Sequence, residues 1–217
     1  MSYVYDAGEK YPVYYLDFYN GSTLVDSVSS SEIIDLQVTR NLISEKPTVG
    51  QANSGELQAT FFKPSFSIPR MAGVNVRIVL NSSTYSAGWF FIDTRSENPT
   101  DNTLTIHCYD AMLMAEQLCP TSGVDMTVVS AIATQIGVSV DASVTATIVN
   151  SYTITSDVAN NSSRDVLKTI GAAYGGSFFV TRDGLLGFAG LAIPAETFYL
   201  VDQDGDPILF GGDRIIV

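Results

Sequence analysis

The first half of the chain alternates apolar and polar residues with a period of two, and this pattern restricts the folds open to it. The segment LQATF at residues 57–61 follows the pattern, as does LQVTRNL at residues 36–42. Because side chains two residues apart lie on the same face of a strand, each segment is expected to form a strand with one buried face. Near Asp110 the period changes, and apolar residues recur at helical spacing. We therefore predict an all-β part followed by a part that contains helices.

At least six strands are expected before the first helix. Asn20-Gly21 accepts the positive φ angles of a tight turn, so the strands around it are expected to form a β-hairpin. Two stretches rich in turn-forming residues, NSSTYSAG at 81–88 and SENPTDN at 96–102, separate the later strands. Strands at this spacing without helices between them favour an antiparallel barrel or sandwich, closed so that edges are not left bare. The expected strands are residues 13–18, 23–27, 36–42, 57–61, 75–80, 89–94 and 103–109.

The apolar spacing after Asp110 predicts three helices. Asp110 and Ser162 belong to the residue types that cap helix N-termini, and Gly137 and Gly175 can end a helix in the left-handed conformation. The expected helices run from Asp110 to about Cys119, from Asp125 or Thr127 to Gly137, and from Ser162 or Ser163 to Gly175.

These elements predict a mainly β protein with an α+β part, divided into three segments. Residues 1–115 are expected to form an antiparallel β-barrel domain. Residues 116–192 are expected to form a small α+β domain, which includes a hairpin that turns at Arg182-Asp183-Gly184. Residues 193–217 are expected to form a further hairpin, turning at Asp204-Gly205, and a last strand that can return to the first domain.

The composition indicates a folded protein and argues against nucleic-acid binding. Of the 217 residues, 46% are hydrophobic and 16% are charged, a balance that does not fit a disordered chain. The net charge is −12, and the 11 Lys and Arg residues are too scattered to neutralise a phosphate backbone. The N-terminal MSYVYDAGEKY lacks the basic start and apolar run of a signal peptide, and no stretch reaches the length of a membrane span. We therefore expect synthesis in the cytosol without export and no membrane partner.

The residues that could carry chemistry do not form a catalytic or metal-binding pattern. A structural zinc needs about four ligands, whereas His107, Cys108 and Cys119 supply three, and His107 and Cys108 are expected on opposite faces of one strand. A Ser-His-acid triad would depend on His107, the single histidine, and no Gly-x-Ser-x-Gly motif is present. We predict no catalytic, cofactor-binding or metal-binding residues and no enzymatic activity, and we expect the cysteines to be free thiols.

Two further clusters have a structural interpretation beside a functional one. Asp202, Asp204 and Asp206 could offer carboxylates to calcium, but they lack the spacing of an EF-hand and are also good turn formers. Seven aromatic residues near the N-terminus could bind sugars or proteins, or could pack within a sheet and at a subunit interface. They are Tyr3, Tyr5, Tyr11, Tyr14, Tyr15, Phe18 and Tyr19.

The order of several phrases from about Ile33 to Phe188 resembles the N-terminal part of phage tail-hub proteins. This family includes the tail-tip, tail-associated-lysin type of long-tailed phages and the central baseplate hub of contractile ones. The ordered set carries the resemblance, since no single phrase is specific. The phrases are IIDLQVTRNLISEKPTVGQANSGELQATFF, IPRMAGVNVRIVL, GWFFIDTR, NTLTIHCYDAM, VDMTVVSAIATQIGVSV and SSRDVLKTIGAAYGGSFFVTRDGLLGF.

The resemblance implies a structural protein of a phage or prophage virion. In such hubs the first domain is a tail-tube-like β-barrel, and the following helices open a second, inserted domain. A homotrimeric ring connects the tail tube to the tip, contacts the distal tail and tip proteins, and lets DNA pass through its channel without specific binding. The protein would be assembled in the bacterial host cytoplasm and located in the virion tail. Because hubs of this kind continue further, we expect either a short hub or one part of a longer one.

Two other functions stay open beside the hub. One is a β-rich module that binds a glycan or a host surface, and the other is a cell-wall hydrolase, for which no catalytic residues are visible. The hub interpretation also predicts an acidic channel wall, because a basic wall would grip DNA phosphates. The candidate acids are Asp35, Glu45, Glu56, Asp93, Glu97 and Asp101, and a wall dominated by Arg40, Lys46, Lys63, Arg70, Arg77 and Arg95 would contradict this prediction.

Overall fold

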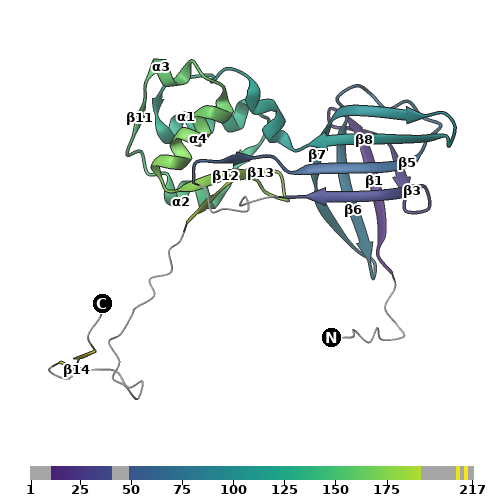
Figure 1. The fold of residues 1–217 in the computed structure, drawn as a ribbon, viewed down its shortest axis with the longest axis horizontal. Helices are drawn as coiled ribbons and strands as arrows, with labels where there is room; N and C mark the ends of the chain where they lie inside the picture. The colour runs from purple at the N-terminus through teal and green to yellow at the C-terminus, as the bar shows by residue number, and fades with distance from the viewer. Residues whose placement is uncertain (1–10, 41–48, 192–208, 211–212, 215–217) are drawn as a thin grey trace.

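The computed structural model describes residues 11–40 and 49–191, together with two short strands near the C-terminus. Figure 1 shows two units side by side, one made of strands and one in which helices and strands mix. Each unit encloses its own cluster of buried hydrophobic side chains. The β unit comprises residues 11–40 and 55–109, and the mixed unit comprises residues 49–53 and 111–191.

The β unit is one seven-stranded sheet with the strand order β2-β1-β6-β7-β8-β5-β3. All neighbouring strands are antiparallel. The prediction of at least six strands before the first helix is confirmed within the described residues. The strands are β1 (Val13–Asn20), β2 (Thr23–Ser29), β3 (Ile33–Thr39), β5 (Glu56–Phe62), β6 (Gly73–Leu80), β7 (Ser83–Asn98) and β8 (Thr103–Tyr109).

This sheet is rolled around a single core. Strands β1 and β5 are separated by β6, β7 and β8, which would place them roughly 19 Å apart in a flat sheet. The rings of Phe18 in β1 and Phe61 in β5 nevertheless have centroids 5.8 Å apart. The two aromatic side chains therefore meet across the inside of the rolled sheet. The edge strands β2 and β3 do not pair with each other among the described residues, so closure into a barrel stays a prediction.

One turn of the β unit lies one residue later than predicted, and another is shorter than predicted. The β1–β2 hairpin forms as predicted, but its turn is Gly21-Ser22, one residue later than the predicted Asn20-Gly21, because Asn20 still pairs with Thr23; Gly21 has a φ of 60°. The β6–β7 turn was expected to span residues 81–88, but it consists of Asn81 and Ser82, both with positive φ. Such a two-residue turn matches the twist of the flanking strands, so pairing resumes at once and β7 begins at Ser83.

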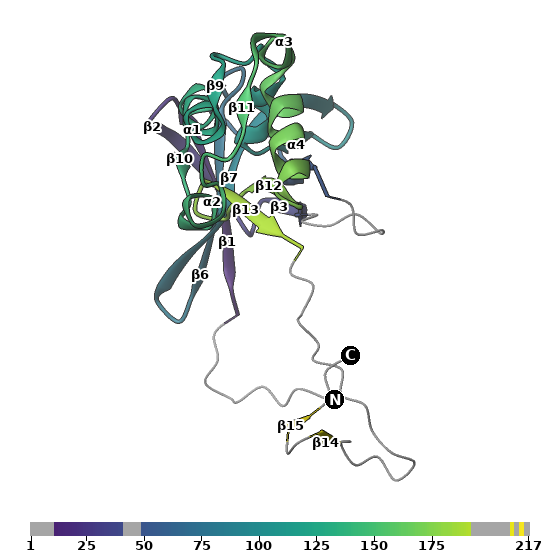
Figure 2. The same ribbon diagram turned by 90° about the vertical axis from the view of Figure 1, so that its left-hand side faces the viewer.

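The mixed unit is a four-stranded sheet with helices packed against it. The sheet order is β10-β13-β12-β4, and Figure 2 shows α4 beside β12 and α2 beside β13. None of the described helices is long and apolar enough to cross a membrane. The elements are β4 (Ala52–Asn53), the 3-10 helix η1 (Ala111–Glu116), β9 (Gly123–Val124), α1 (Asp125–Gln135), β10 (Ser139–Val140), α2 (Ala142–Thr147), β11 (Thr153–Ile154), α3 (Ser156–Ala159), α4 (Ser163–Ala173), β12 (Gly176–Val180) and β13 (Leu185–Gly190).

Two of the three predicted helices are confirmed with their caps. Helix α1 ends before Gly137, which has a φ of 77°, and α4 begins after Ser162, whose hydroxyl accepts a hydrogen bond from the backbone of Asp165. The first helix is shorter than the predicted 110–119, because the backbone after Glu116 bonds elsewhere. Cys119 donates to the carbonyl of Asn161, so this segment is extended instead of helical. The short helices α2 and α3 were not predicted.

The chain crosses from the β unit into the mixed unit and returns, which was not predicted. Strand β4 lies parallel to β12, with Ala52 opposite Phe178. The crossing is tight at Gly50, whose φ is 74° and where a Cβ atom would lie 2.9 Å from the Cβ of Ala172. Ala52 therefore belongs to the core of the second half of the chain, and the limits of the domains stay a prediction.

The C-terminal region contributes two short paired strands. Strands β14 (Leu209–Phe210) and β15 (Asp213–Arg214) are antiparallel to each other and form a separate sheet. The predicted turn at Asp204-Gly205 lies outside the described residues, and the return of this region to the first domain stays a prediction.

We expect Phe61→Ala to destabilise the protein by about 3–5 kcal/mol, because Phe61 is fully buried and its loss leaves a cavity against Phe18. The neighbouring Phe62 is 50% exposed, so Phe62→Ala serves as a matched control with a cost below about 1 kcal/mol. Urea denaturation followed by circular dichroism measures both. Equal losses for the two variants would contradict the rolled core.

Candidate functional site

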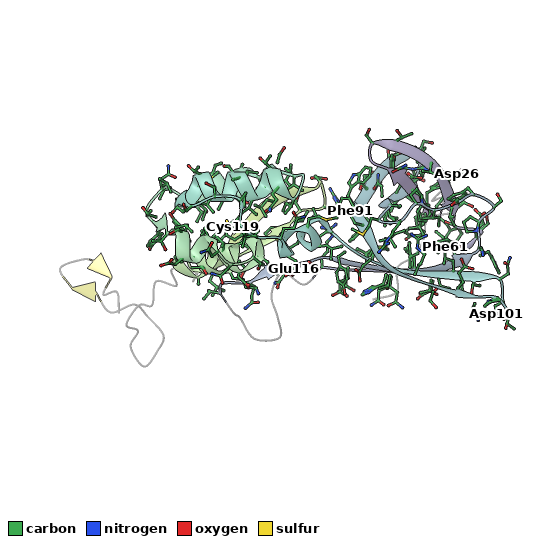
Figure 3. All side chains as sticks on the ribbon, turned by 90° about the horizontal axis from the view of Figure 1, so that it is seen from above. Asp26, Phe61, Phe91, Asp101, Glu116 and Cys119 are labelled. Atoms are coloured by element: carbon green, nitrogen blue, oxygen red, sulfur yellow. The ribbon has the colours of Figure 1, made fainter. Side chains whose placement is uncertain are left out.

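Three charged side chains lie at or next to the contact between the two units. Figure 3 labels Phe91 of the β unit and Glu116 of the mixed unit close to this junction. Phe91 points away from the core of its own sheet and packs against the core of the mixed unit. The charged residues are Arg164, Asp110 and Arg40.

Arg164 ties together three segments that are far apart in the sequence. From α4 it donates to the carbonyl of Ala52 at 3.2 Å, to the carbonyl of Met112 at 2.8 Å and to Oγ of Ser54 at 3.0 Å. Its Nε lies 2.6 Å from Oε1 of Glu116, which is an ion-pair distance although the angle is not that of a hydrogen bond. The planar guanidinium suits this role because its donors point in several fixed directions.

Asp110 joins the end of the sheet to the first helical turn. One carboxylate oxygen accepts a hydrogen bond from the backbone of Gly55 at 2.6 Å, and the other accepts one from Met112 at 3.0 Å. The backbone of Asp110 also donates to the carbonyl of Gly55 at 3.0 Å. Burial raises the pKa of this carboxyl to about 6, although the two backbone hydrogen bonds and the charges of Arg40 and Arg164 oppose the shift.

Arg40 forms a second tie between the units. Its terminal nitrogens donate to the carbonyl of Val180 in the mixed unit at 3.0 Å and to the carbonyl of Ala87 in the β unit at 3.1 Å. The guanidinium carbon lies 5.4 Å from the centroid of the Phe90 ring. A side chain at Gly88 would overlap this guanidinium, and its φ of 135° also requires glycine. Burial lowers the pKa of Arg40.

A cavity of about 170 Å³ lies beside these ties. Its wall includes Arg40, Asp110 and residues 179–182. The terminal nitrogens of Arg40 and both carboxylate oxygens of Asp110 are bonded to backbone groups, whereas Nε of Arg40 is buried without a hydrogen-bond partner. This arrangement can hold the two units against each other.

The residues predicted to be near any chemistry are separated by the fold. His107 faces outward, with Nε2 3.6 Å from Oε2 of Glu56, while Cys108 points into the core of the β unit. This confirms the prediction that they lie on opposite faces. Cys119 is buried in the mixed unit, and both cysteines are free. Burial, with a smaller effect of Asp93, raises the pKa of Cys108 to about 12, which makes it unreactive. Within the described ranges, no group of three His, Cys, Asp or Glu side chains could hold a metal ion.

The other predicted clusters are described only in part. Phe18 is a core residue, whereas Tyr11 and Tyr14 are exposed and Tyr15 and Tyr19 are half-buried on the outer face of the sheet. The predicted channel acids within the described residues, Asp35, Glu56, Asp93, Glu97 and Asp101, are all exposed. Their orientation toward a channel stays a prediction. Tyr3, Tyr5, Glu45, Lys46, Asp202, Asp204 and Asp206 lie outside the described residues.

No family model matches the chain, and no curated protein does. Among solved structures, it is similar to prophage tail protein gp18 from Listeria monocytogenes EGD-e, with a TM-score of 0.55 and 13% identity over 88% of this chain and 56% of that one. It is also similar to the 43 kDa tail protein of prophage MuSo2 from Shewanella oneidensis, with a TM-score of 0.50 and 12% identity over 82% of this chain and 53% of that one. The chain thus spans just over half the length of each. It has the fold of prophage tail proteins.

We expect Arg164→Met to destabilise the protein by about 2–4 kcal/mol, because the carbonyls of Ala52 and Met112 lose a charged donor in a partly buried place. Hydrogen exchange should rise at residues 50–56 before it rises in the sheet of the β unit. Lys168→Met on the same helix is the control, since Lys168 forms a part-exposed pair with Asp165 worth less than about 1 kcal/mol. Equal effects of the two variants would show that Arg164 does not hold Ala52 and Met112 against α4.

Asp110 should make stability depend on pH in a defined direction. Its pKa is higher in the folded chain than in the unfolded one, so its contribution is full below about pH 4 and is lost as the pH rises through about 6. The free energy of unfolding of the wild type, minus that of Asp110→Asn, should therefore fall between pH 4 and pH 7, by up to about 3 kcal/mol. Denaturant titrations of both proteins across this range measure it. A constant difference would contradict the assignment.

Proposed function

We propose that this chain is a structural component of a phage tail and acts as a tail hub or baseplate hub between the tail tube and the tail tip. The observation that carries the proposal is the fold shared with two prophage tail proteins over 82% and 88% of the chain. The ordered phrases that resemble tail hubs support the finer assignment.

The junction supports a mechanical role. Arg164 and Arg40 each bond to elements that lie far away in the sequence, and Asp110 links the sheet to the first helical turn. A protein that connects the tail tube to the tail tip has to keep its two units in a constant relative orientation. Buried charge-assisted hydrogen bonds provide that orientation more precisely than apolar contacts alone.

The finer proposal is a ring of three copies around the DNA channel. The rolled sheet of the β unit would be the tube-like barrel of each copy. Its edge strands β2 and β3 lack a second neighbour among the described residues, and an edge of this kind can pair with another chain. The proposed partners are the tail tube, the distal tail protein and the tip protein. We propose no enzymatic turnover, with any wall-degrading activity supplied by other proteins of the tail.

Gold-labelled antibody against this chain should mark one end of the tail tube, next to the tip, in intact particles. Labelling of the head, or labelling only of unassembled protein, would contradict the hub. Antibody pre-adsorbed with the purified chain is the control. Cryo-electron microscopy of the same particles should resolve three copies, and six copies or one would reject the trimer.

A further inference from the structure

The outer face of the β unit carries an ordered group of aromatic and polar side chains that neither core uses. Tyr15, Asp17 and Tyr19 alternate along β1 with the core residues Leu16 and Phe18, so they lie on the outer face. Two rows then continue across β1, β6 and β7. Asp17 is opposite Asn75, which is opposite Trp89, and Tyr19 is opposite Gly73 in the next row.

Trp89 and Tyr19 form a shelf over Gly73. Their ring centroids are 4.7 Å apart, and the benzene ring of Trp89 lies about 4 Å from the position that a Cβ atom of Gly73 would take. Because Gly73 has no side chain, the indole rests on the strand. Trp89 is 37% exposed, and its ring is tilted by 53° to that of Tyr19. The result is an aromatic surface with little freedom to move.

The polar side chains beside the shelf are held in place and carry no net charge. Arg77 donates to both carboxylate oxygens of Asp17, at 2.6 and 2.9 Å, and Ser27 donates to the same carboxylate at 2.6 Å. The guanidinium of Arg77 lies 4.0 Å from the centroid of the Tyr15 ring. Asn75 accepts a hydrogen bond from Ser86 through Oδ1, which orients its Nδ2 donors away from Ser86. The pair Asp17–Arg77 cancels its own charge, so this face does not select an ionic ligand.

Strand addition does not suit this face. Strands β1 and β6 have a neighbour on both sides over the shelf, so their backbone donors and acceptors are already paired, whereas β7 pairs with β6 at Trp89 and with β8 from Phe91 onward. A ligand must therefore contact side chains. A hexose ring fits these groups, because one of its faces presents C–H groups to an aromatic ring while its hydroxyls lie at the rim within reach of amide donors.

We propose that Trp89, Tyr19 and Asn75 form a binding site for a neutral sugar on the outer face of the β unit. A pyranose ring stacks on the exposed side of Trp89, Tyr19 borders it, and Nδ2 of Asn75 donates to a hydroxyl. The affinity per sugar unit is low, because a flat site removes only one side of the ring from water. Several copies in one particle would raise the overall affinity by multivalency. The site does not depend on the hub role, since sugar binding and position in the virion are measured separately.

The test uses the fluorescence of Trp89, which is the single tryptophan of the chain. The full chain is titrated with neutral hexasaccharides of glucose, galactose and N-acetylglucosamine. We expect at least one of them to change the emission in a saturable way. Failure of all three sugars to do so at millimolar concentration would overturn the proposal.

Variants then locate the site. We expect Tyr19→Ala to weaken binding about tenfold and Tyr19→Phe to preserve it, because stacking needs the ring and not the hydroxyl. Tyr85→Ala is the matched control, since Tyr85 is an exposed tyrosine on the same strand as Trp89 and should leave binding unchanged. Equal weakening by Tyr19→Ala and Tyr85→Ala would overturn the proposal. A further outcome would also overturn the proposal: the wild type binds no sugar, and Trp89→Ala changes the oligomeric mass measured by light scattering. The face would then be an interface between copies of the chain.

Discussion

Residues 49–56 belong to both units of this molecule, and the hydrogen bonds that hold this segment determine how the units are arranged. The segment adds β4 to the sheet of the mixed unit and continues into β5 of the β unit. Arg164 holds β4 through the carbonyl of Ala52, and Asp110 holds the start of the return through Gly55. Without these bonds the crossing would leave buried backbone groups unpaired, which costs more than a surface contact can restore. Asp110 thereby links the two units, and Arg164 fixes β4 within the mixed unit.

The rolled sheet limits where such a crossing can occur. Its inside is filled by aromatic side chains that meet from distant strands, as Phe18 and Phe61 do, so the chain can leave only at an end of the roll. Arg40 lies at that end, against Phe90 and between carbonyls of the two units. Gly88 leaves room for it. The apolar core of the β unit is thus followed directly by the polar junction at the end of the roll.

The outer face of the sheet is connected to the same junction. Phe91 continues the outer face that carries Trp89, and its ring packs on the core of the mixed unit. The shelf over Gly73 therefore lies next to the part of the outer face that the mixed unit covers. The strands that carry the shelf are held in place by the core of the β unit. This explains how aromatic rings can stay partly exposed in an ordered arrangement: their backbone is held by the roll, and their polar neighbours are held by the pair Asp17–Arg77.

The amino-acid sequence by itself determined the local features of this protein. Alternation around Leu57 predicted a half-buried strand, Ser162 predicted the start of α4, and Gly137 predicted the end of α1. Each of these depends on steric and hydrogen-bonding preferences within a few residues. The tertiary structure alone decided that Arg164 would bond to Ala52, 112 residues away, and that Arg40 would bond to Val180, 140 residues away. It also decided that the segment after Glu116 would be extended, because the backbone of this segment forms hydrogen bonds with the backbone around Asn161. Such pairings depend on which surfaces meet when the whole chain packs, and no spacing within a short stretch of sequence records them.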